Sequence, residues 1–153
     1  MQEARPSVEQ QTLSREFVLT GNLDALTPGR NAIMDFIREH CADEQQEIDI
    51  LLALQEALAN AILYGCKNDA GKLIQCSVEI SPSAIEFIVR DPGEGFDTSS
   101  AIDETEDGSN LTQHGRGILL MRSLMDELCY RHTGSELHMK KLRSSGSWSV
   151  ASG

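Results

Sequence analysis

The sequence has few basic residues. Its 153 residues include 13 Lys and Arg against 24 Asp and Glu, which gives a formal net charge of -11 at pH 7. Such a surplus of negative charge repels the phosphates of nucleic acids and of anionic membrane surfaces. We therefore expect neither nucleic acid nor a membrane among the partners of this protein.

The cysteines show no pairing pattern. They are Cys41, Cys66, Cys76 and Cys129, with no C-x-x-C pair and no His at metal-ligand spacing. A zinc site and a dithiol redox motif are not indicated, and reduced structural thiols of a cytoplasmic protein are the simplest interpretation. Residues 1–11 lack the apolar segment of a signal peptide, and no uncharged apolar run is long enough to span a bilayer. We expect a soluble protein that is not exported.

Two common nucleotide motifs are also missing. No G-x-x-x-x-G-K-[ST] sequence occurs, and neither Gly93-x-Gly95 nor Gly115-x-Gly117 is completed by the third glycine of a Rossmann motif. No G-x-S-x-G nucleophile motif is present. Neither a Walker nor a Rossmann site is supported, and no local nucleophile signature is found.

Hydrophobic periodicity predicts alternating strands and helices. A short strand is expected at residues 17–20, where an apolar and β-branched run ends at a Gly-Asn pair. A helix follows, with Thr27 as N-cap and Pro28 at the first helical position. Its inward face consists of Ile33, Phe36, Ile37 and Cys41.

The second predicted helix carries a polar pair. It begins at Asp43, which forms a capping-box pattern with Gln46, and ends at Gly65. Its inward stripe is Leu51, Leu54, Leu58 and Ile62, with Ala53, Ala57 and Ala61 beside it. Glu56 and Asn60 are four residues apart, so at about 100° per residue they share a face nearly opposite the stripe. That face either lines a ligand site or is an ordinary solvated surface.

A hairpin with an acid at its end follows. The two apolar rows are Ile74, Cys76, Val78 and Ile80, and then Ile85, Phe87 and Val89. Asp91 continues the second row, and a carboxylate in that position needs a partner. The exocyclic amine of adenine donates to a carboxylate, whereas guanine presents a carbonyl there. Pro92 favours extended backbone before it, and Gly93 and Gly95 allow close approach of a flat ring. A plain strand-ending turn is the alternative.

A second glycine pair precedes the last predicted helix. Residues 97–110 are polar and acidic, which predicts a mobile loop. A helix then begins around Gly115 to Gly117 and continues to Met125. Glycines at a helix start let phosphate oxygens approach free backbone N–H groups, and Arg116 can add a positive charge. A glycine-based helix entry with an exposed arginine explains the same residues.

Taken in order, the three segments resemble the ATP-binding domain shared by histidine kinases, DNA gyrase, heat-shock chaperones and mismatch-repair ATPases. Residues 56–61 resemble its N box, residues 91–96 its first glycine box and residues 115–117 its second. The resemblance covers residues 17–141. The continuation at residues 60–65 is most similar to anti-sigma factor serine kinases of the RsbW and SpoIIAB type. The resemblance implies an α+β fold, a two-layer sandwich of a mixed β-sheet with helices on one face, known as the Bergerat-type ATP-binding fold.

The resemblance also implies roles for individual residues. Glu56 would act as the general base, and Asn60 would supply a side-chain oxygen to Mg²⁺. Asp91 would bind adenine. The other ATP-binding residues would be Gly93, Gly95, Gly115, Arg116, Gly117 and Ser135. In this set Ser135 would assist Asp91, although the family usually has threonine there.

The implied activity is that of a Mg²⁺- and ATP-dependent protein serine kinase in a partner-switching circuit. It would phosphorylate a STAS-domain anti-sigma antagonist, sequester a sigma factor or another effector, and form a homodimer. A histidine kinase is a poor fit, because no histidine is followed by the acid that marks a phosphoacceptor. A non-catalytic module that responds to ATP or ADP is the alternative. We expect a polar N-terminal segment (1–14), the ATP-binding domain (15–142) and a Ser- and Gly-rich tail (143–153).

Overall fold

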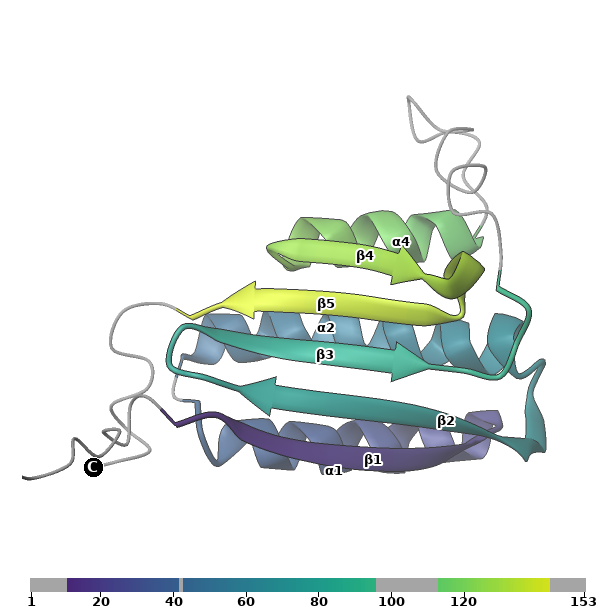
Figure 1. Ribbon diagram of the computed structural model, residues 1–153, viewed down its shortest axis with the longest axis horizontal. Coiled ribbons are helices and arrows are strands. Elements are labelled where there is room, and N and C mark those ends of the chain that lie inside the picture. Colours follow the sequence, from purple (N-terminus) through teal and green to yellow (C-terminus); the bar gives the residue numbers. More distant parts are fainter. Residues whose placement is uncertain (1–10, 42, 96–112, 144–153) are drawn as a thin grey trace, which may run out of the picture.

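The protein is a sheet covered by helices on one face. The computed structural model describes residues 11–41, 43–95 and 113–143. The strands are β1 (Leu13–Gly21), β2 (Asp69–Ile80), β3 (Ala84–Arg90), β4 (Glu127–Arg131) and β5 (Glu136–Leu142), in the spatial order β1-β2-β3-β5-β4. The helices are α1 (Leu26–Arg38), α2 (Glu44–Asn60) and α4 (Gln113–Leu124), and all three lie on the same face of the sheet (Figure 1). The expected N-terminal segment, the loop at 97–110 and the tail lie wholly or largely outside the described residues.

The expected α+β sandwich is confirmed, but the mixed sheet is wrong. All four strand pairs are antiparallel. The connection through α4 does make β3 and β4 run in the same direction, as a crossover requires. These two strands are not neighbours, because β5 lies between them and is antiparallel to both. A parallel pair therefore never forms, although the topology contains a crossover.

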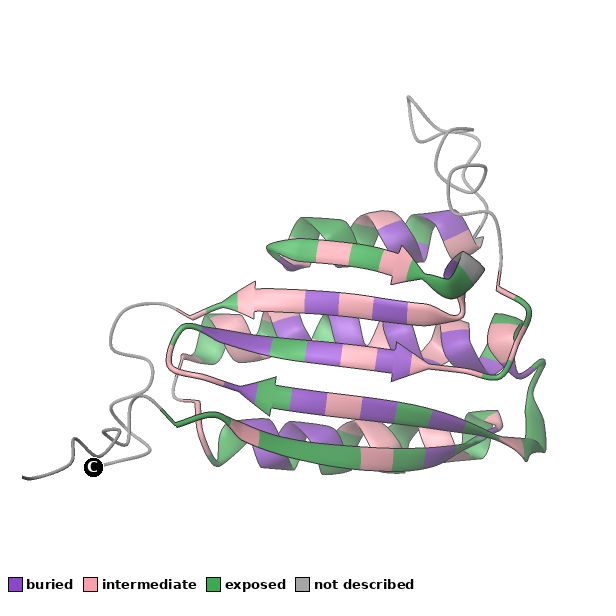
Figure 2. Ribbon diagram, viewed as in Figure 1, coloured by how far each residue is buried: buried purple, intermediate pink, exposed green. Residues whose placement is uncertain are grey.

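Helix α2 is the centre of the helical layer, with α1 on one side and α4 on the other (Figure 1). Three residues of the predicted inward stripe, Leu54, Leu58 and Ile62, are completely buried, and the fourth, Leu51, is half-buried and packs against the core. Buried residues recur along α2 and along the strands that it covers (Figure 2). The segment Glu44–Gly65 is long and apolar enough to pass for a membrane span. Its apolar character has a simpler origin, because its buried residues form the middle of the core.

The starts of the first two helices test the capping predictions. The Asp43 side chain accepts a hydrogen bond from the backbone N–H of Gln46 at 3.0 Å, which confirms the predicted start of α2. The predicted cap at Thr27 is wrong. A 3₁₀ turn at Leu23–Ala25 leads directly into α1, whose N-cap is Ala25. The preceding turn already supplies helical geometry, so no capping side chain is needed at Thr27.

The predicted hairpin is confirmed, and its alternation sets the position of Asp91. Strands β2 and β3 pair in register, with Cys76 opposite Val89 and Val78 opposite Phe87. These four side chains are buried, as expected for one face of the sheet. Asp91 follows β3 on the same parity and is half-buried. The sheet thus delivers a carboxylate to the edge of the core.

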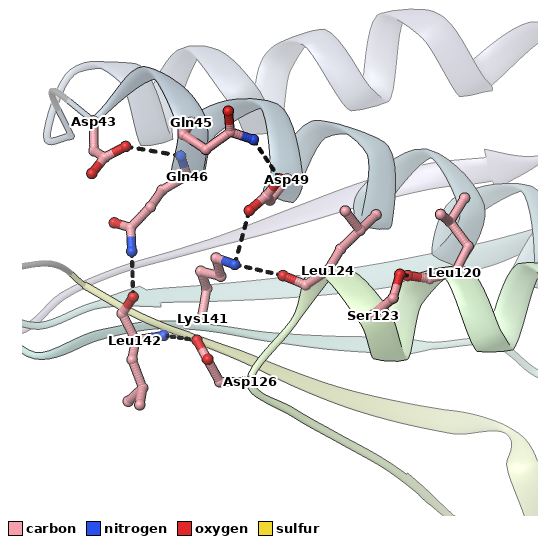
Figure 3. A network of polar contacts seen from close by, with 10 residues as sticks. All are labelled: Asp43, Gln45, Gln46, Asp49, Leu120, Ser123, Leu124, Asp126, Lys141 and Leu142. Carbon is pink, nitrogen blue, oxygen red and sulfur yellow. Dashed lines mark hydrogen bonds and ion pairs between the residues drawn. The ribbon is translucent and has the colours of Figure 1, made fainter.

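A polar network ties the helices to β5 at the opposite end of the sheet (Figure 3). Lys141 donates to the Asp49 carboxylate at 3.0 Å and to the backbone oxygen of Leu124 at 2.6 Å. Leu142 N–H donates to the Asp126 carboxylate at 2.6 Å. A lysine at the carboxyl end of a helix also meets the negative end of the helix dipole. The network therefore fixes the end of α4 against α2 and β5.

Candidate functional site

A pocket opens to solvent where β3 ends, between α2 and β4. Helix α2 and the turn after it contribute Ala57, Asn60, Ala61, Tyr64 and Gly65, and β3 with the residues after it contributes Val89, Asp91 and Gly95. The remaining lining residues are His114, Tyr130, Gly134 and Leu137. The pocket thus joins residues that are far apart in the sequence, among them three that the sequence predicts for ATP binding.

One end of the pocket is built around the carboxylate of Asp91. The backbone N–H of Gly93 donates to Asp91 Oδ1 at 2.8 Å, and the Asp91 backbone N–H donates to the Ser135 carbonyl at 3.0 Å. Burial raises the pKa of Asp91, and the Gly93 bond partly opposes that rise. The carboxylate is fixed through Oδ1, so Oδ2 is the oxygen left to accept from a ligand.

Glycine is required on both sides of this carboxylate. A Cβ on Gly65 would lie 2.2 Å from Asp91 Cγ, and a Cβ on Gly93 would lie 2.6 Å from the Gly65 carbonyl oxygen. Both distances are too short for any side chain. Gly95 has a φ of 83°, the left-handed region that glycine adopts without strain. The roles of Gly93 and Gly95 in shaping a base pocket stay predictions, which these contacts support. Gly65, which also lines the pocket, was expected only to end a helix.

The helix geometry changes directly after Asn60. Residues Ala61–Gly65 form a π-helical turn that continues α2, and single π turns within α-helices are frequent at functional sites. The wider turn ends at Gly65, next to Asp91. Asn60, at the end of α2, and Gly65, at the end of this turn and next to Asp91, therefore line the same pocket as Asp91.

The start of α4 lies beside the polar face of α2. A Cβ on Gly117 would lie 3.6 Å from both Asn60 Nδ2 and Glu56 Oε1. Glu56 and Asn60 are each half-buried, and Gly115 and Gly117 are buried. The N box and the second glycine box, 56 residues apart at Asn60 and Arg116, therefore meet in space. The Arg116 side chain is exposed, which leaves it outside this contact.

Comparison with known proteins identifies the family of this chain. The profile of the histidine kinase-like ATPase domain matches residues 19–141. This chain belongs to that family. It is 35% identical over 102 residues to the serine-protein kinase RsbW of two Staphylococcus aureus strains, bovine RF122 / ET3-1 and MRSA252, which covers 61% of this chain and 64% of theirs. The chain thus spans a little less than two thirds of the length of these curated relatives.

A solved structure shares the fold. The RsbU and RsbW domains of Rv1364c from Mycobacterium tuberculosis match with a TM-score of 0.56 at 17% sequence identity. The match covers 86% of this chain and 33% of that chain. The histidine kinase-like ATPase fold is thus found both by sequence and by backbone shape.

Membership of this ATPase family raises the question of a metal ion. Among the described residues, no three His, Cys, Asp or Glu side chains gather into a metal site. Mg²⁺ in nucleotide sites is commonly held by one or two protein groups together with phosphate oxygens and waters. Asn60 fits that pattern by its place, because its side chain lines the pocket and its amide borders the space that Gly117 leaves open. The atom nearest that space is Nδ2, so a half-turn of the amide would bring Oδ1, the atom that binds a cation, toward it.

The structure adds two tyrosines, Tyr64 and Tyr130, that sequence reasoning did not place in the site. The Tyr64 and His114 rings stack with centroids 4.0 Å apart and planes 13° apart, and both line the pocket. Burial lowers the pKa of His114 and so favours the neutral ring. Tyr130 reaches the pocket from β4. The position of Tyr64, three residues after the N box, was an available signal, but no local pattern marks Tyr130.

Ser135 approaches Asp91 through its backbone. Its carbonyl accepts the Asp91 N–H, while its hydroxyl donates to the His132 carbonyl at 3.0 Å within the preceding turn. The contact between the two residues is thus present, but it does not depend on the side chain. A role for the Ser135 hydroxyl stays a prediction.

Proposed function

We propose that this protein is a Mg²⁺- and ATP-dependent protein serine kinase that phosphorylates a STAS-domain anti-sigma antagonist and sequesters a sigma factor or another effector. The observation that carries the proposal is the division of one site. Glu56, Asn60 and Gly117 meet at the polar face of α2, while Asp91 stands at the other end of the pocket. ATP has the same division, because its purine base is at one end and its charged phosphates are at the other.

Asp91 would select the base. Its Oδ2 can accept a hydrogen bond from the exocyclic amine of adenine, because Oδ1 is already held by Gly93. Guanine would place a carbonyl oxygen against the same carboxylate, and two acceptors repel each other. Gly65 and Gly95 would let the flat ring approach the backbone.

The phosphates would extend toward the start of α4. Gly115 and Gly117 leave its first turn open to phosphate oxygens, and the positive end of the helix dipole favours them. Arg116 would add its charge from the surface. Asn60 would hold Mg²⁺, which when bound offsets the negative charge of the phosphates.

Glu56 would act as the catalytic base. Its carboxylate would take the proton of the substrate serine hydroxyl, and the serine oxygen would form a bond to the γ-phosphorus. The bond from that phosphorus to the β–γ bridging oxygen would break, and ADP would leave. The position of Glu56 one helical turn from Asn60 supports this role, since both side chains border Gly117.

The partners are those that the resemblance implies, and the match to relatives named serine-protein kinase RsbW supports the kinase part of the proposal. Phosphorylation of the antagonist would decide which partner is held. We also propose that the protein is a cytoplasmic homodimer, as the resemblance implies.

Transfer of labelled phosphate tests the proposal. Wild-type protein with ATP and Mg²⁺ should label a purified STAS-domain antagonist on serine, and Glu56→Gln should bind nucleotide without transfer. Calorimetric titration with ADP confirms binding in both proteins. Nucleotide binding without transfer by the wild type would instead support a non-catalytic, nucleotide-responsive module.

A further inference from the structure

Two stacked rings connect the end of α2 with the start of α4. The ring centroids of Tyr64 and His114 lie 4.0 Å apart with 13° between the planes, and both side chains line the pocket. Tyr64 belongs to the π-helical turn that continues α2, and His114 is the second residue of α4. At this separation the two ring faces are in van der Waals contact. The stack therefore joins two segments that are far apart in the sequence.

The stack lies next to the glycines that are proposed to bind phosphate. Gly115 follows His114 directly and is buried. Two residues further along, Gly117 borders the polar face of α2. Hydrogen bonds from backbone N–H groups to phosphate oxygens weaken steeply outside a narrow range of distance and angle. The contact made by the His114 ring thus bears on where the first turn of α4 lies relative to α2.

Other contacts hold the rest of α4. Its far end is fixed through the Leu124 carbonyl, which accepts a hydrogen bond from Lys141 at 2.6 Å (Figure 3). Along its inner face, Ile118 and Met121 are completely buried in the core. The stack adds a contact at the end of the helix that faces the pocket, where a small displacement would move the phosphate-binding groups.

The shape of the His114 ring matters more here than its charge. Burial lowers the pKa of His114, which favours the neutral ring at pH 7. A neutral imidazole adds no net positive charge for a phosphate group. A phenylalanine ring would keep the flat face that contacts Tyr64 but would remove the ring nitrogens, so it separates stacking from hydrogen bonding.

We propose that His114 is a positioning residue, whose ring stacks on Tyr64 and so holds the start of α4 where its backbone N–H groups meet the nucleotide phosphates. This inference rests on the proposed function, because it takes the start of α4 as the phosphate site. The His114 side chain contacts neither the phosphates nor the metal ion in this account. It acts through the backbone of Gly115, which follows it.

Binding of ADP and of adenosine tests the inference without measuring activity. Competition against a fluorescent ATP analogue gives both affinities, and their ratio reports the contribution of the phosphates. In His114→Leu this ratio should fall about two- to tenfold, the range expected for one aromatic pair, while adenosine affinity stays unchanged. His114→Phe keeps the stack and should keep the wild-type ratio.

His40→Leu is the matched control. It removes another histidine ring in contact with an aromatic residue, since His40 meets Phe36 edge-on with centroids 5.4 Å apart. His40 does not line the pocket, so the ratio should stay as in the wild type.

A double variant assigns the effect to the stack. Tyr64→Leu breaks the stack from the other side and should also lower the ratio, and adding His114→Leu should lower it no further. Thermal denaturation of each variant confirms folding. An unchanged ratio in His114→Leu, an equal loss in His114→Phe, or a further loss in the double variant would overturn this inference alone. ADP that binds the wild type no more tightly than adenosine would overturn the phosphate site as well.

Discussion

Gly65 lies directly against the carboxylate of Asp91. A Cβ built on Gly65 would come within 2.2 Å of Asp91 Cγ and 2.5 Å of both carboxylate oxygens. The two residues belong to different layers of the fold, one to the turn after α2 and the other to the end of β3. Their contact joins the turn after α2 to the end of β3 at the Asp91 end of the pocket.

Gly65→Ala should weaken ADP binding at least about tenfold, because the added methyl group must displace the Asp91 carboxylate. Gly65 does not have a positive φ, so the backbone accepts alanine. Calorimetric titration with ADP measures the loss. Gly71→Ala is the matched control, since its Cβ meets only the Asp69 carboxylate, at 3.2 Å, in an exposed part of β2. Equal affinities of the two variants would show that the contact has no role in binding.

Asp91→Asn should reverse the preference for the base. The Gly93 N–H would hold the amide oxygen, so the new amino group would face the ligand. Two donors would then meet at the exocyclic amine of adenine, and ADP affinity should fall about 10- to 100-fold. GDP should gain relative to ADP, because guanine offers a carbonyl there. Competition between the two nucleotides gives the ratio of their affinities. Asp91→Ala should bind ADP more weakly without binding GDP more tightly. A ratio unchanged from wild type would exclude Asp91 from base selection.

We also predict that the difference in stability between Asp91→Asn and the wild type depends on pH. Burial raises the folded-state pKa of Asp91, so the folded protein binds its proton more readily than the unfolded chain. The charged form is therefore unfavourable at neutral pH, and this effect disappears as pH falls through the raised pKa to below about 3.9. Without nucleotide, Asp91→Asn should be more stable than wild type at pH 7, with the difference shrinking on acidification. Urea denaturation at several pH values measures it, and a difference that grows on acidification would contradict the account.

The parts of the candidate site that depend on residues close together in the sequence could be predicted. Spacing alone places Glu56 and Asn60 on one helix face, and strand parity alone places Asp91 at the edge of the core. The contacts of Gly65 and Tyr130 depend on chain packing across many residues, so no window of sequence contains them. The same holds for the sheet order, because the insertion of β5 between β3 and β4 is decided by the whole sheet. Local patterns can also mislead, as at Thr27, where a preceding 3₁₀ turn leads into the helix in place of the expected cap.

Lys141→Met should lower the free energy of unfolding by about 1–3 kcal/mol. It keeps the apolar stem but removes the donor that serves Asp49 and the Leu124 carbonyl. Urea denaturation gives the change, with an unaltered m-value expected. Lys140→Met is the control, because Lys140 pairs at 3.6 Å with an exposed Glu127 and should contribute less than about 1 kcal/mol. Similar losses in both variants would place the network of Figure 3 among ordinary surface contacts.

Helices α2 and α4 meet at Gly117, which lies at the centre of the proposed ATP site. Gly117 does not have a positive φ, so Gly117→Ala should preserve α4 and even favour it by about 0.5–1 kcal/mol. The new methyl group would fill the space beside Asn60 and Glu56. Calorimetric titration with ADP and Mg²⁺ is the most direct test. We predict one ADP bound per wild-type chain and at least about tenfold weaker binding by a fully folded Gly117→Ala variant. No binding by the wild type, or equal binding by both proteins, would contradict an ATP site between α2 and α4.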